Sequence, residues 1–503
     1  MDKKSSLSKR GIRRLSRTNW PKGELEQNDQ DKDAQESTLP VEEESSAFLI
    51  TPVLPSMPEN LNVAPTVLNS FKAFEAAQDL GDTLARFNKL LADCDLEGAG
   101  VDEPWRLYSH IKGAVYSKLS FRYKQLFKLL DARYNLGVYK SKPTSRRRVC
   151  IVGGGPVGLR AAIEIALLGG QVVLLEKRAL FSRENMLHLW PWVVQDLTSL
   201  GAKVLFSQFS KSMPPTSDDK EKPFYTITTQ PQIPTMEFTA VLSASGTNDK
   251  LAEHAGISRF VFCRKEALGI VCYFPNLGTA EEAKVKEFSW TSQLKHQILD
   301  KLREVGIDIE NIVYYRGEMH YLVMTPKRQN LVERQVVNEN LADSTDLVLD
   351  ENVNSSALHE YVKAIVDFVG IPRKTEFTRV SLFDFSSRSR ADKAANILTS
   401  YGKKLYVGLI GDSLLEPLWH EDVGTCRGFL GAMDAVWMIS QIGEQSDEQL
   451  LADRDNVYRV MQSVSTLRRE GLRKNVRKYT VDPASRYSTN ALQNSIPAIR
   501  LLQ

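Results

Sequence analysis

The sequence predicts an α/β fold in which a parallel sheet is interleaved with a second sheet and preceded by helices. An apolar run at 148–152 precedes a glycine turn, an amphipathic helix that ends at Leu168 and a second apolar run at 172–175, which together form a βαβ unit. Much later in the chain, an apolar run at 404–410 predicts another buried strand, which ends in Gly411 and Asp412. Between these parts, "NIVYY" and "HYLVM" predict two neighbouring strands joined by the turn "RGEM".

Helical periodicity predicts the remaining elements. Apolar residues recur at helical spacing from Phe71 to Leu91 and from Tyr116 to Leu130, so we expect residues 68–140 to form a helical segment. The stretches 289–305 and 338–369 also have a helical pattern, and "RGFLGAMDAVWMISQI" predicts the helix that follows the last strand. We expect residues 141–490 to form the main domain and residues 491–503 a short C-terminal tail.

The first part of the chain carries two blocks of opposite charge. Residues 1–18 hold seven Lys or Arg and one Asp, whereas residues 19–50 hold nine Asp or Glu and two Lys. Such blocks cannot bury enough apolar surface to offset the loss of chain entropy on folding. We therefore expect residues 1–67 to form a disordered tail.

Composition limits the class of protein. The chain has 503 residues, of which 42% are hydrophobic, and this is enough for two or more domains with a large core. No stretch of eighteen apolar residues predicts a membrane span, and the N-terminus lacks the apolar core of a signal peptide, so we expect a cytoplasmic location, with the nucleus as the alternative. Five singly scattered cysteines favour reduced thiols over a zinc site.

Gly153, Gly155 and Gly158 have the G-x-G-x-x-G spacing of a dinucleotide-binding turn in a Rossmann-like sheet. The first glycine permits a tight turn, the second lets a pyrophosphate approach the backbone, and the third lets helix and strand pack closely. N–H groups at the helix N-terminus then face the phosphate charge. Glu176, at the end of the next strand, is placed to accept hydrogen bonds from a ribose. The alternative is a glycine-rich turn that binds no ligand.

Asp412 suggests which dinucleotide this is. An Asp at the carboxyl end of a parallel strand can accept hydrogen bonds from the hydroxyls of a ribityl chain, and the N-terminus of the helix that follows can face the pyrimidine end of a flavin. Two half-sites so far apart in the sequence suit FAD, which is extended, better than NAD. Because we find no second G-x-G-x-x-G, we expect the reduced nicotinamide dinucleotide, NADH or NADPH, to dock transiently without a dinucleotide domain of its own.

Several longer strings resemble the monooxygenase domain of the MICAL family. They are "FSRENMLHLWPW" at 181–192, "GIDIENIVYY" at 306–315, "GDSLLEPLW" at 411–419, "RGFLGAMDAVWM" at 427–438 and "YTVDPASRY" at 479–487. The resemblance covers roughly residues 69–487 in the expected order. It implies an FAD-binding fold of the aromatic-hydroxylase type and an FAD- and NADPH-dependent oxidation of actin methionines that disassembles filaments. F-actin is then the expected partner, and nucleic acid is not.

The resemblance also implies site residues at the matching positions. Asn185 would contact the edge of the flavin ring and Trp419 would shield the site from water, and we take these two as the catalytic candidates. Lys177, Arg178 and Arg183 could neutralise phosphates. The complete set of implied FAD contacts is Val157, Glu176, Lys177, Arg178, Arg183, Asn185, Tyr321 and Asp412.

Within the monooxygenase domain, the sequence departs from the family pattern in three respects. A helix and strand that the family places after "GAKVLF" have no counterpart near residues 209–211, the flavin loop reads His420-Glu421-Asp422-Val423-Gly424 where the family has more glycine, and Ser245 replaces an Asp of the pyrophosphate turn. The calponin-homology and LIM domains usual in the family are not found, so we expect partner recognition within this module. We assign docking on acidic F-actin to a basic helical stripe formed by Arg468, Arg469, Arg473, Lys474, Arg477 and Lys478.

Two other functions remain open from the sequence. The missing helix and the acidic flavin loop would also fit a catalytically degenerate module that only binds actin or another cytoskeletal partner. A hydroxylase of small aromatic compounds would share the fold, but it rests on fold analogy alone.

Overall fold

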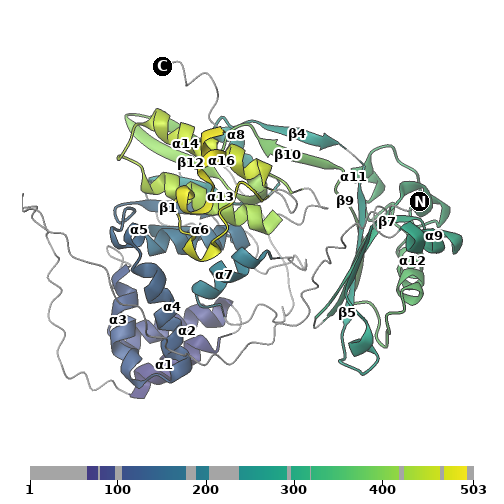
Figure 1. Cartoon of the computed structure of the whole chain (residues 1–503), viewed down its shortest axis with the longest axis horizontal. Coiled ribbons are helices and arrows are strands. Elements are labelled where there is room, and N and C mark those ends of the chain that lie inside the picture. Colours follow the sequence, from purple (N-terminus) through teal and green to yellow (C-terminus); the bar gives the residue numbers. More distant parts are fainter. Residues whose placement is uncertain are drawn as a thin grey trace, which may run out of the picture. The chain divides into compact units, whose positions relative to one another are not determined.

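The computed structural model describes residues 65–77, 80–96, 105–176, 189–202, 237–247, 249–264, 266–291, 296–317, 319–417, 424–464 and 469–494 (Figure 1). Most of the predicted tail and all of the predicted gap near 209–211 lie outside these residues. The first helix begins at Pro65, slightly before the expected boundary at 68, because the fixed φ of proline suits the first helical turn.

The segment in front of the sheet is helical, as predicted. Its core is one apolar cluster that includes Phe71, Leu90, Val115 and Phe127, and the rings of Phe71 and Phe127 stack with centroids 5.9 Å apart. The elements are α1 (Pro65–Glu75), α2 (Leu80–Asp93), α3 (Trp105–Val115), η1 (Tyr116–Lys118), α4 (Phe121–Tyr134) and α5 (Gly137–Lys140).

The first sheet has five strands in the order β11-β12-β3-β1-β2. The pairs β1–β2, β1–β3 and β3–β12 are parallel, and the edge strand β11 is antiparallel to β12. Strands from the two ends of the main domain are therefore neighbours, as the two predicted half-sites require. The strands are β1 (Arg148–Val152), β2 (Gln171–Leu175), β3 (Ala240–Ser243), β11 (Ala395–Ser400) and β12 (Lys403–Leu409).

Helices pack against this sheet and bury its apolar side chains. The predicted helix after the last strand is α13 (Gly424–Ser440), which packs on α6 (Pro156–Leu167) and on α14 (Asp447–Ser463). Ile151, Leu242, Ile165 and Val436 are fully buried in their common core. A shorter helix, α7 (Pro191–Ser199), lies against α4.

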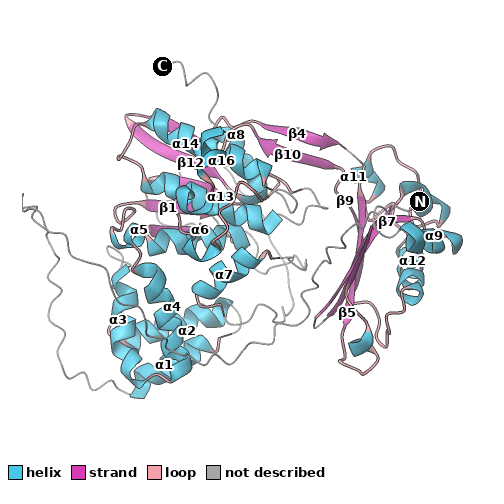
Figure 2. Ribbon diagram, viewed as in Figure 1, coloured by secondary structure: helices cyan, strands magenta, loops and turns pink. Residues whose placement is uncertain are grey.

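The second sheet is antiparallel, with the order β6-β7-β8-β5-β9 (Figure 2). The predicted hairpin is confirmed, with Tyr315 opposite Tyr321. The helix predicted over 289–305 is confirmed in its later part, where α9 (His296–Glu304) forms. Its first residues are wrong, because residues 288–291 form a strand in which Phe288 and Trp290 stack on one face. The strands are β5 (Leu268–Pro275), β6 (Phe288–Thr291), β7 (Ile309–Arg316), β8 (Met319–Pro326) and β9 (Arg379–Asp384).

Helices that lie between these strands in the sequence cover one face of the second sheet. Leu299 of α9 and Leu358 and Val362 of α12 are buried in the same cluster as Ile270 of β5 and Leu322 of β8. The helices are η2 (Glu282–Lys284), α9 (His296–Glu304), α10 (Arg328–Glu333), α11 (Ser344–Leu347) and α12 (Ser355–Phe368).

A two-stranded antiparallel ribbon, β4 (Arg259–Arg264) with β10 (Ser387–Ala391), connects the sheets along the chain. The chain leaves the first sheet after β3, passes α8 (Lys250–His254) and β4, and returns through β10. The last elements are η5 (Val476–Lys478), α15 (Pro483–Arg486) and α16 (Thr489–Asn494), so the expected tail at 491 begins within a helix. Among the described residues, no helix is long and apolar enough to cross a membrane.

Candidate functional site

The glycine turn has the geometry that its spacing predicts. Gly153 has φ +114°, and a Cβ there would lie 2.3 Å from the carbonyl oxygen of Ala244. A Cβ on Gly158 would lie 2.0 Å from the carbonyl oxygen of Gly153. By contrast, no atom lies within 4 Å of a Cβ built on Gly155. The first and third glycines thus permit close packing, and the second leaves its backbone open to a ligand.

Glu176 extends from the end of β2 to the same turn. Its Oε2 accepts a hydrogen bond of 2.8 Å from the backbone N–H of Gly154. This bond orients the carboxylate beside the N-terminus of α6, where N–H groups without helical partners are available to a phosphate. A carboxylate accepts several hydrogen bonds, so the same group can also accept from a ribose.

The loop after β12 meets the glycine turn. Gly411, at the start of η3 (Gly411–Ser413), has φ +63°, and a Cβ there would touch Val157 at 3.4 Å. Val157 also packs so closely on Gly428 of α13 that a Cβ at Gly428 would lie 2.4 Å from it. Asp412 is half-buried in this loop. The two half-sites that the sequence predicted separately are therefore neighbours.

Serine residues join the loop after β3 to the loop after β12. The Oγ of Ser413 accepts from the N–H of Gly246 at 3.1 Å and donates to its carbonyl oxygen at 3.0 Å. Ser245 lies between Ser243, at 3.1 Å, and Ser413, at 3.4 Å. At the position where the family has an Asp, this chain therefore has a hydroxyl that links two loops. The sequence prediction missed Ser413, although it directly follows Asp412.

The remaining predicted residues are only partly tested. Lys177, Arg178, Arg183, Asn185 and Trp419 lie outside the described residues. Tyr321 lies on β8 of the second sheet, where its ring stacks on that of Tyr273 at 6.3 Å, so it does not belong to the sheet that carries the glycine turn.

The predicted basic stripe is not a helical face. Only residues 476–478 form a short 3-10 turn, and Arg468 lies outside the described residues. Arg469 lies over the ring of Trp190 at 4.3 Å, and Arg473 donates to the carbonyl oxygens of Ala484 and Tyr487. Lys474, Arg477 and Lys478 are exposed. Side-chain contacts, and not a helix, therefore determine the conformation of the described part of this segment.

A buried ion-pair cluster lies behind the glycine turn. Arg160 of α6 binds Glu164 at 2.6 Å and Asp196 of α7 at 2.7 Å, and Arg133 of α4 binds the same two carboxylates. Burial alone would raise the pKa of Glu164, but the two guanidinium groups outweigh burial and hold this pKa at about 2. The cluster fixes α6 relative to α4 and α7.

The residues at this edge suit an extended dinucleotide. Parallel strands β1, β3 and β12 present their carboxyl ends together, which is where ligands bind in open α/β sheets. The open backbone at Gly155 can receive a diphosphate, the carboxylate of Glu176 bonds to the glycine turn, and Asp412 follows Gly411, which lies against Val157. Hydroxyl-rich groups at both ends of a diphosphate, as in FAD, match these two acceptors.

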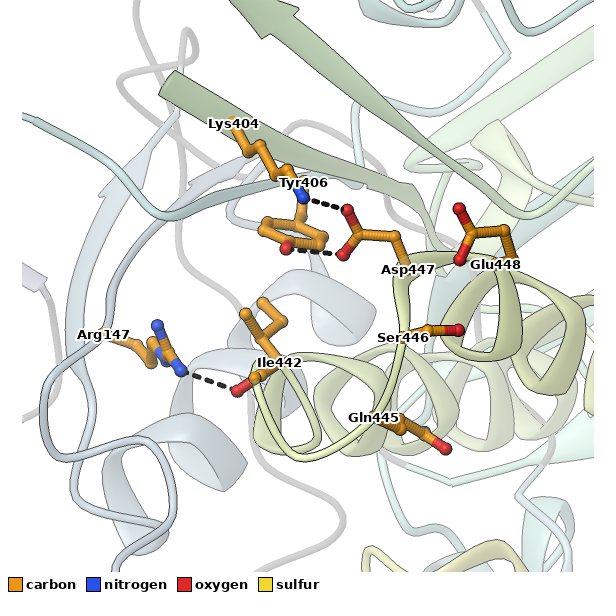
Figure 3. Close-up of a pocket in the computed structure, with 9 residues that line it drawn as sticks. Arg147, Lys404, Tyr406, Ile442, Gln445, Ser446, Asp447 and Glu448 are labelled. Carbon is orange, nitrogen blue, oxygen red and sulfur yellow. Dashed lines mark hydrogen bonds and ion pairs between the residues drawn. The ribbon is translucent and has the colours of Figure 1, made fainter. Parts of the chain in front are cut away.

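A cavity of about 440 Å³ lies at the opposite, amino-terminal end of these strands (Figure 3). Lys404 and the hydroxyl of Tyr406 both bind Asp447, and Arg147 donates to the carbonyl oxygen of Ile442 at 2.6 Å. Lys404, Tyr406 and Asp447 are thus engaged with one another, and Arg147 is engaged with a backbone carbonyl group. It is not the candidate site.

Comparison with known proteins gives two matching families. Residues 146–185, which contain β1, the glycine turn, α6, β2 and Glu176, match the family described as "FAD binding domain". Residues 266–394 match the family described as "Mical, Rossman domain". In this chain the second match folds as the antiparallel sheet β6-β7-β8-β5-β9 and includes β10 of the ribbon.

Curated relatives align along most of the chain. It is 34% identical over 480 residues to protein-methionine sulfoxide oxidase mical3a of Danio rerio, an alignment that covers 85% of this chain and 23% of that protein. It is 34% identical over 476 residues to F-actin monooxygenase MICAL1 of Mus musculus, with 85% and 44% covered. The chain therefore spans less than half the length of these relatives.

Among solved structures, the tetrameric form of 2-methyl-3-hydroxypyridine-5-carboxylic acid oxygenase is similar over 64% of this chain and 89% of that chain. The sequence identity is 17% and the TM-score 0.41.

Proposed function

Because the chain carries the flavin-binding module of the MICAL family, we propose that it is an FAD-dependent monooxygenase that takes electrons from NADPH. Its proposed substrate is the methionine side chain of actin. One oxygen atom of O₂ would be transferred to the thioether sulfur and the other would leave as water, with NADPH as the reductant. The sulfoxide is polar where methionine is apolar, so its formation in a filament would promote disassembly.

One observation carries this proposal. The glycine turn with Glu176 and the loop with Asp412 meet at the carboxyl edge of one parallel sheet, although they are far apart in the sequence. A single nucleotide-sized ligand must contact both loops to use both carboxylates. The names of the curated relatives support methionine oxidation and F-actin as the substrate class.

The chain's own groups have binding and positioning roles in this proposal. The N-terminus of α6 and Gly155 would bind the diphosphate, Glu176 the adenosine ribose, and Asp412 the ribityl hydroxyls. Bound FAD would supply the electron transfer from NADPH and the activation of O₂. Asn185 and Trp419 stay our candidates for contact with the flavin ring and exclusion of water.

The transient docking of NADPH belongs to the proposal as well. Strands β5 to β9 build an antiparallel sheet, which offers no second βαβ unit among the described residues for a nicotinamide dinucleotide. We place the reaction at actin filaments in the cytoplasm, with the nucleus as the alternative.

The test starts from purified full-length protein. We expect a yellow preparation with a flavin spectrum, NADPH oxidation that F-actin accelerates, and methionine sulfoxide in actin by mass spectrometry. Asp412→Ala is the test variant, and we expect it to weaken FAD binding and to abolish the NADPH oxidation that F-actin accelerates. NADH in place of NADPH tests the choice of reductant.

Two results would contradict the proposal. A colourless protein to which added FAD does not bind rejects the flavoenzyme. Co-sedimentation with F-actin without turnover by the FAD-loaded protein would instead favour the degenerate binding module.

A further inference from the structure

Arg259 connects the ribbon to the loop that carries Asp412. It is the first residue of β4, and its Nη1 donates to the backbone carbonyl oxygens of Asp412, at 3.1 Å, and Ser413. Its Nη2 donates to the Oγ of Ser389, at 2.7 Å, and to Oε1 of Glu416, at 2.8 Å. One guanidinium group on β4 thus bonds to Ser389 of β10, to the backbone at residues 412 and 413, and to the side chain of Glu416.

Glu416 completes this contact from the other side. Its carboxylate accepts from the backbone N–H of Ser389 at 3.1 Å and from the hydroxyl of Ser389 at 2.7 Å. The side chains of Arg259 and Glu416 are only 14% and 9% exposed, so solvent screens the ion pair weakly. Charge-assisted bonds are stronger than neutral ones, and the bonds of Arg259 and Glu416 to each other and to Ser389 together fix the geometry of the contact.

Backbone hydrogen bonds next to this ion pair also join the Asp412 loop to β10. The N–H of Glu416 donates to the carbonyl oxygen of Ser389 at 3.1 Å, and the N–H of Ala391 donates to that of Leu414 at 2.9 Å. The loop at 411–416 is therefore attached along its length to β10, the strand by which the chain returns from the second sheet.

We infer that Arg259 and Glu416 position the Asp412 loop for the flavin, and that they couple this loop to the ribbon between the two sheets. This inference rests on the proposed FAD site. Neither residue needs to touch the cofactor, since Arg259 binds the backbone on which the Asp412 carboxylate is carried. Both act as positioning residues, and a change in the ribbon would reach the flavin through them.

The sequence separation explains why this role was not predicted. Arg259 and Asp412 are 153 positions apart in the sequence. The residues next to Arg259 show no pattern that would predict a contact with the Asp412 loop. The string "GDSLLEPLW" contains Glu416, but nothing in the string indicates its partner.

The experiment compares Arg259→Lys with Arg328→Lys in the full-length protein. Arg328 is a matched control in the second sheet region, where it pairs with Glu266 at 2.6 Å and also donates to the backbone carbonyl oxygens of Leu341 and Ala342. FAD affinity is measured by quenching of flavin fluorescence, and the surroundings of the ring by visible circular dichroism at saturating FAD. Thermal unfolding of the apo protein monitors the fold.

We expect Arg259→Lys to raise the Kd for FAD about tenfold, because a lysine ammonium cannot replace the planar fork of bonds. The circular dichroism of the bound flavin should change, and Glu416→Gln should shift both values in the same direction. Arg328→Lys should change only the melting temperature. An effect confined to thermal unfolding would indicate a merely structural role and would overturn the inference.

Ser389→Ala serves as a milder variant if Arg259→Lys does not fold. It removes the bonds of the Ser389 hydroxyl to Arg259 and to Glu416. We therefore expect a smaller rise in the Kd for FAD and a change in the circular dichroism of the bound flavin. Wild-type values for Ser389→Ala, or for Arg259→Lys, overturn the inference but leave the proposed function intact. Failure of the wild-type protein to bind FAD rejects the proposed function instead.

Discussion

At the scale of single residues, different glycines of the turn serve the packing of the fold and the binding of the ligand. A Cβ at Gly158 would overlap the backbone of Gly153, whereas a Cβ at Gly155 meets nothing. We expect Gly158→Ala to lower the free energy of unfolding by at least about 2 kcal/mol, because the backbone must shift. We expect Gly155→Ala to leave unfolding unchanged but to raise the Kd for FAD about tenfold, because the methyl group occupies the space where the diphosphate approaches.

Denaturant unfolding of the apo protein and FAD titration measure these two effects. Gly137→Ala is the control, because a Cβ there also meets no atom within 4 Å and lies at the start of α5, away from the turn. It should alter neither quantity. Equal loss of stability in Gly155→Ala and Gly158→Ala would contradict the assignment of separate roles.

The predicted site residues that the structure brings together are those with a local pattern. Gly153, Gly155 and Gly158 lie within six positions, and Glu176 and Asp412 each end a strand of recognisable apolar residues. Arg259, Glu416 and Ser413 act through partners that are distant in the sequence, so only the folded chain reveals them. Spacing predicts a turn, but it does not predict which side chain will hold that turn in place.

At the scale of elements, the buried ion pairs determine how the helical segment joins the sheet. Glu164 is fully buried between Arg133 and Arg160, which come from α4 and α6. We expect Glu164→Gln to reduce the free energy of unfolding by about 3 kcal/mol at neutral pH, because it leaves the carboxylate of Asp196 alone to offset the desolvation of two buried guanidinium groups. Denaturant unfolding measures this loss.

The pH dependence of stability gives a second test of the same cluster. The pKa of Glu164 is lowered from 4.5 to about 2, so its contribution is full above 4.5 and disappears as the pH falls towards 2. The stability of wild type and Glu164→Gln should therefore converge over this range. Asp300→Asn is the control, because Asp300 pairs with Arg303 in solvent at half exposure, and we expect little effect from it. If the free energies of unfolding of wild type and Glu164→Gln change in parallel with pH, ionisation of the Glu164 carboxylate does not stabilise the fold.

The elements differ in how well the sequence predicted them. The βαβ unit, the strand before Asp412, the helix after it and the hairpin are confirmed, because each has a long apolar run or a clear period. The strand at Phe288–Thr291 was not predicted, because its four residues are too few to establish a period and they precede the helical pattern of α9. The segment at 469–478 has basic residues at helical spacing, but its bonds to carbonyl groups and its contact with Trp190 decide its conformation.

At the scale of the whole molecule, the second sheet is an insertion between neighbouring strands of the first. β3 and β12 pair in parallel, yet the chain between them builds the complete antiparallel sheet. The parallel sheet thus depends on pairing between strands that are widely separated along the chain. Folding through such long-range contacts is slow, and local patterns in the sequence do not specify them.

The proposed contact with F-actin also belongs to this scale, because it depends on net charge over a surface. Lys474, Arg477 and Lys478 are exposed, and Arg469 connects their segment to Trp190, just after the loop expected to carry Asn185. We expect simultaneous change of the three to Glu to weaken co-sedimentation with acidic F-actin, most strongly at low salt, without affecting FAD content. The control reverses the same charge in the second-sheet region, at Lys284, Lys286 and Lys301, which are also exposed. Equal weakening by both sets would show that only overall charge matters, and that the segment is not the docking surface.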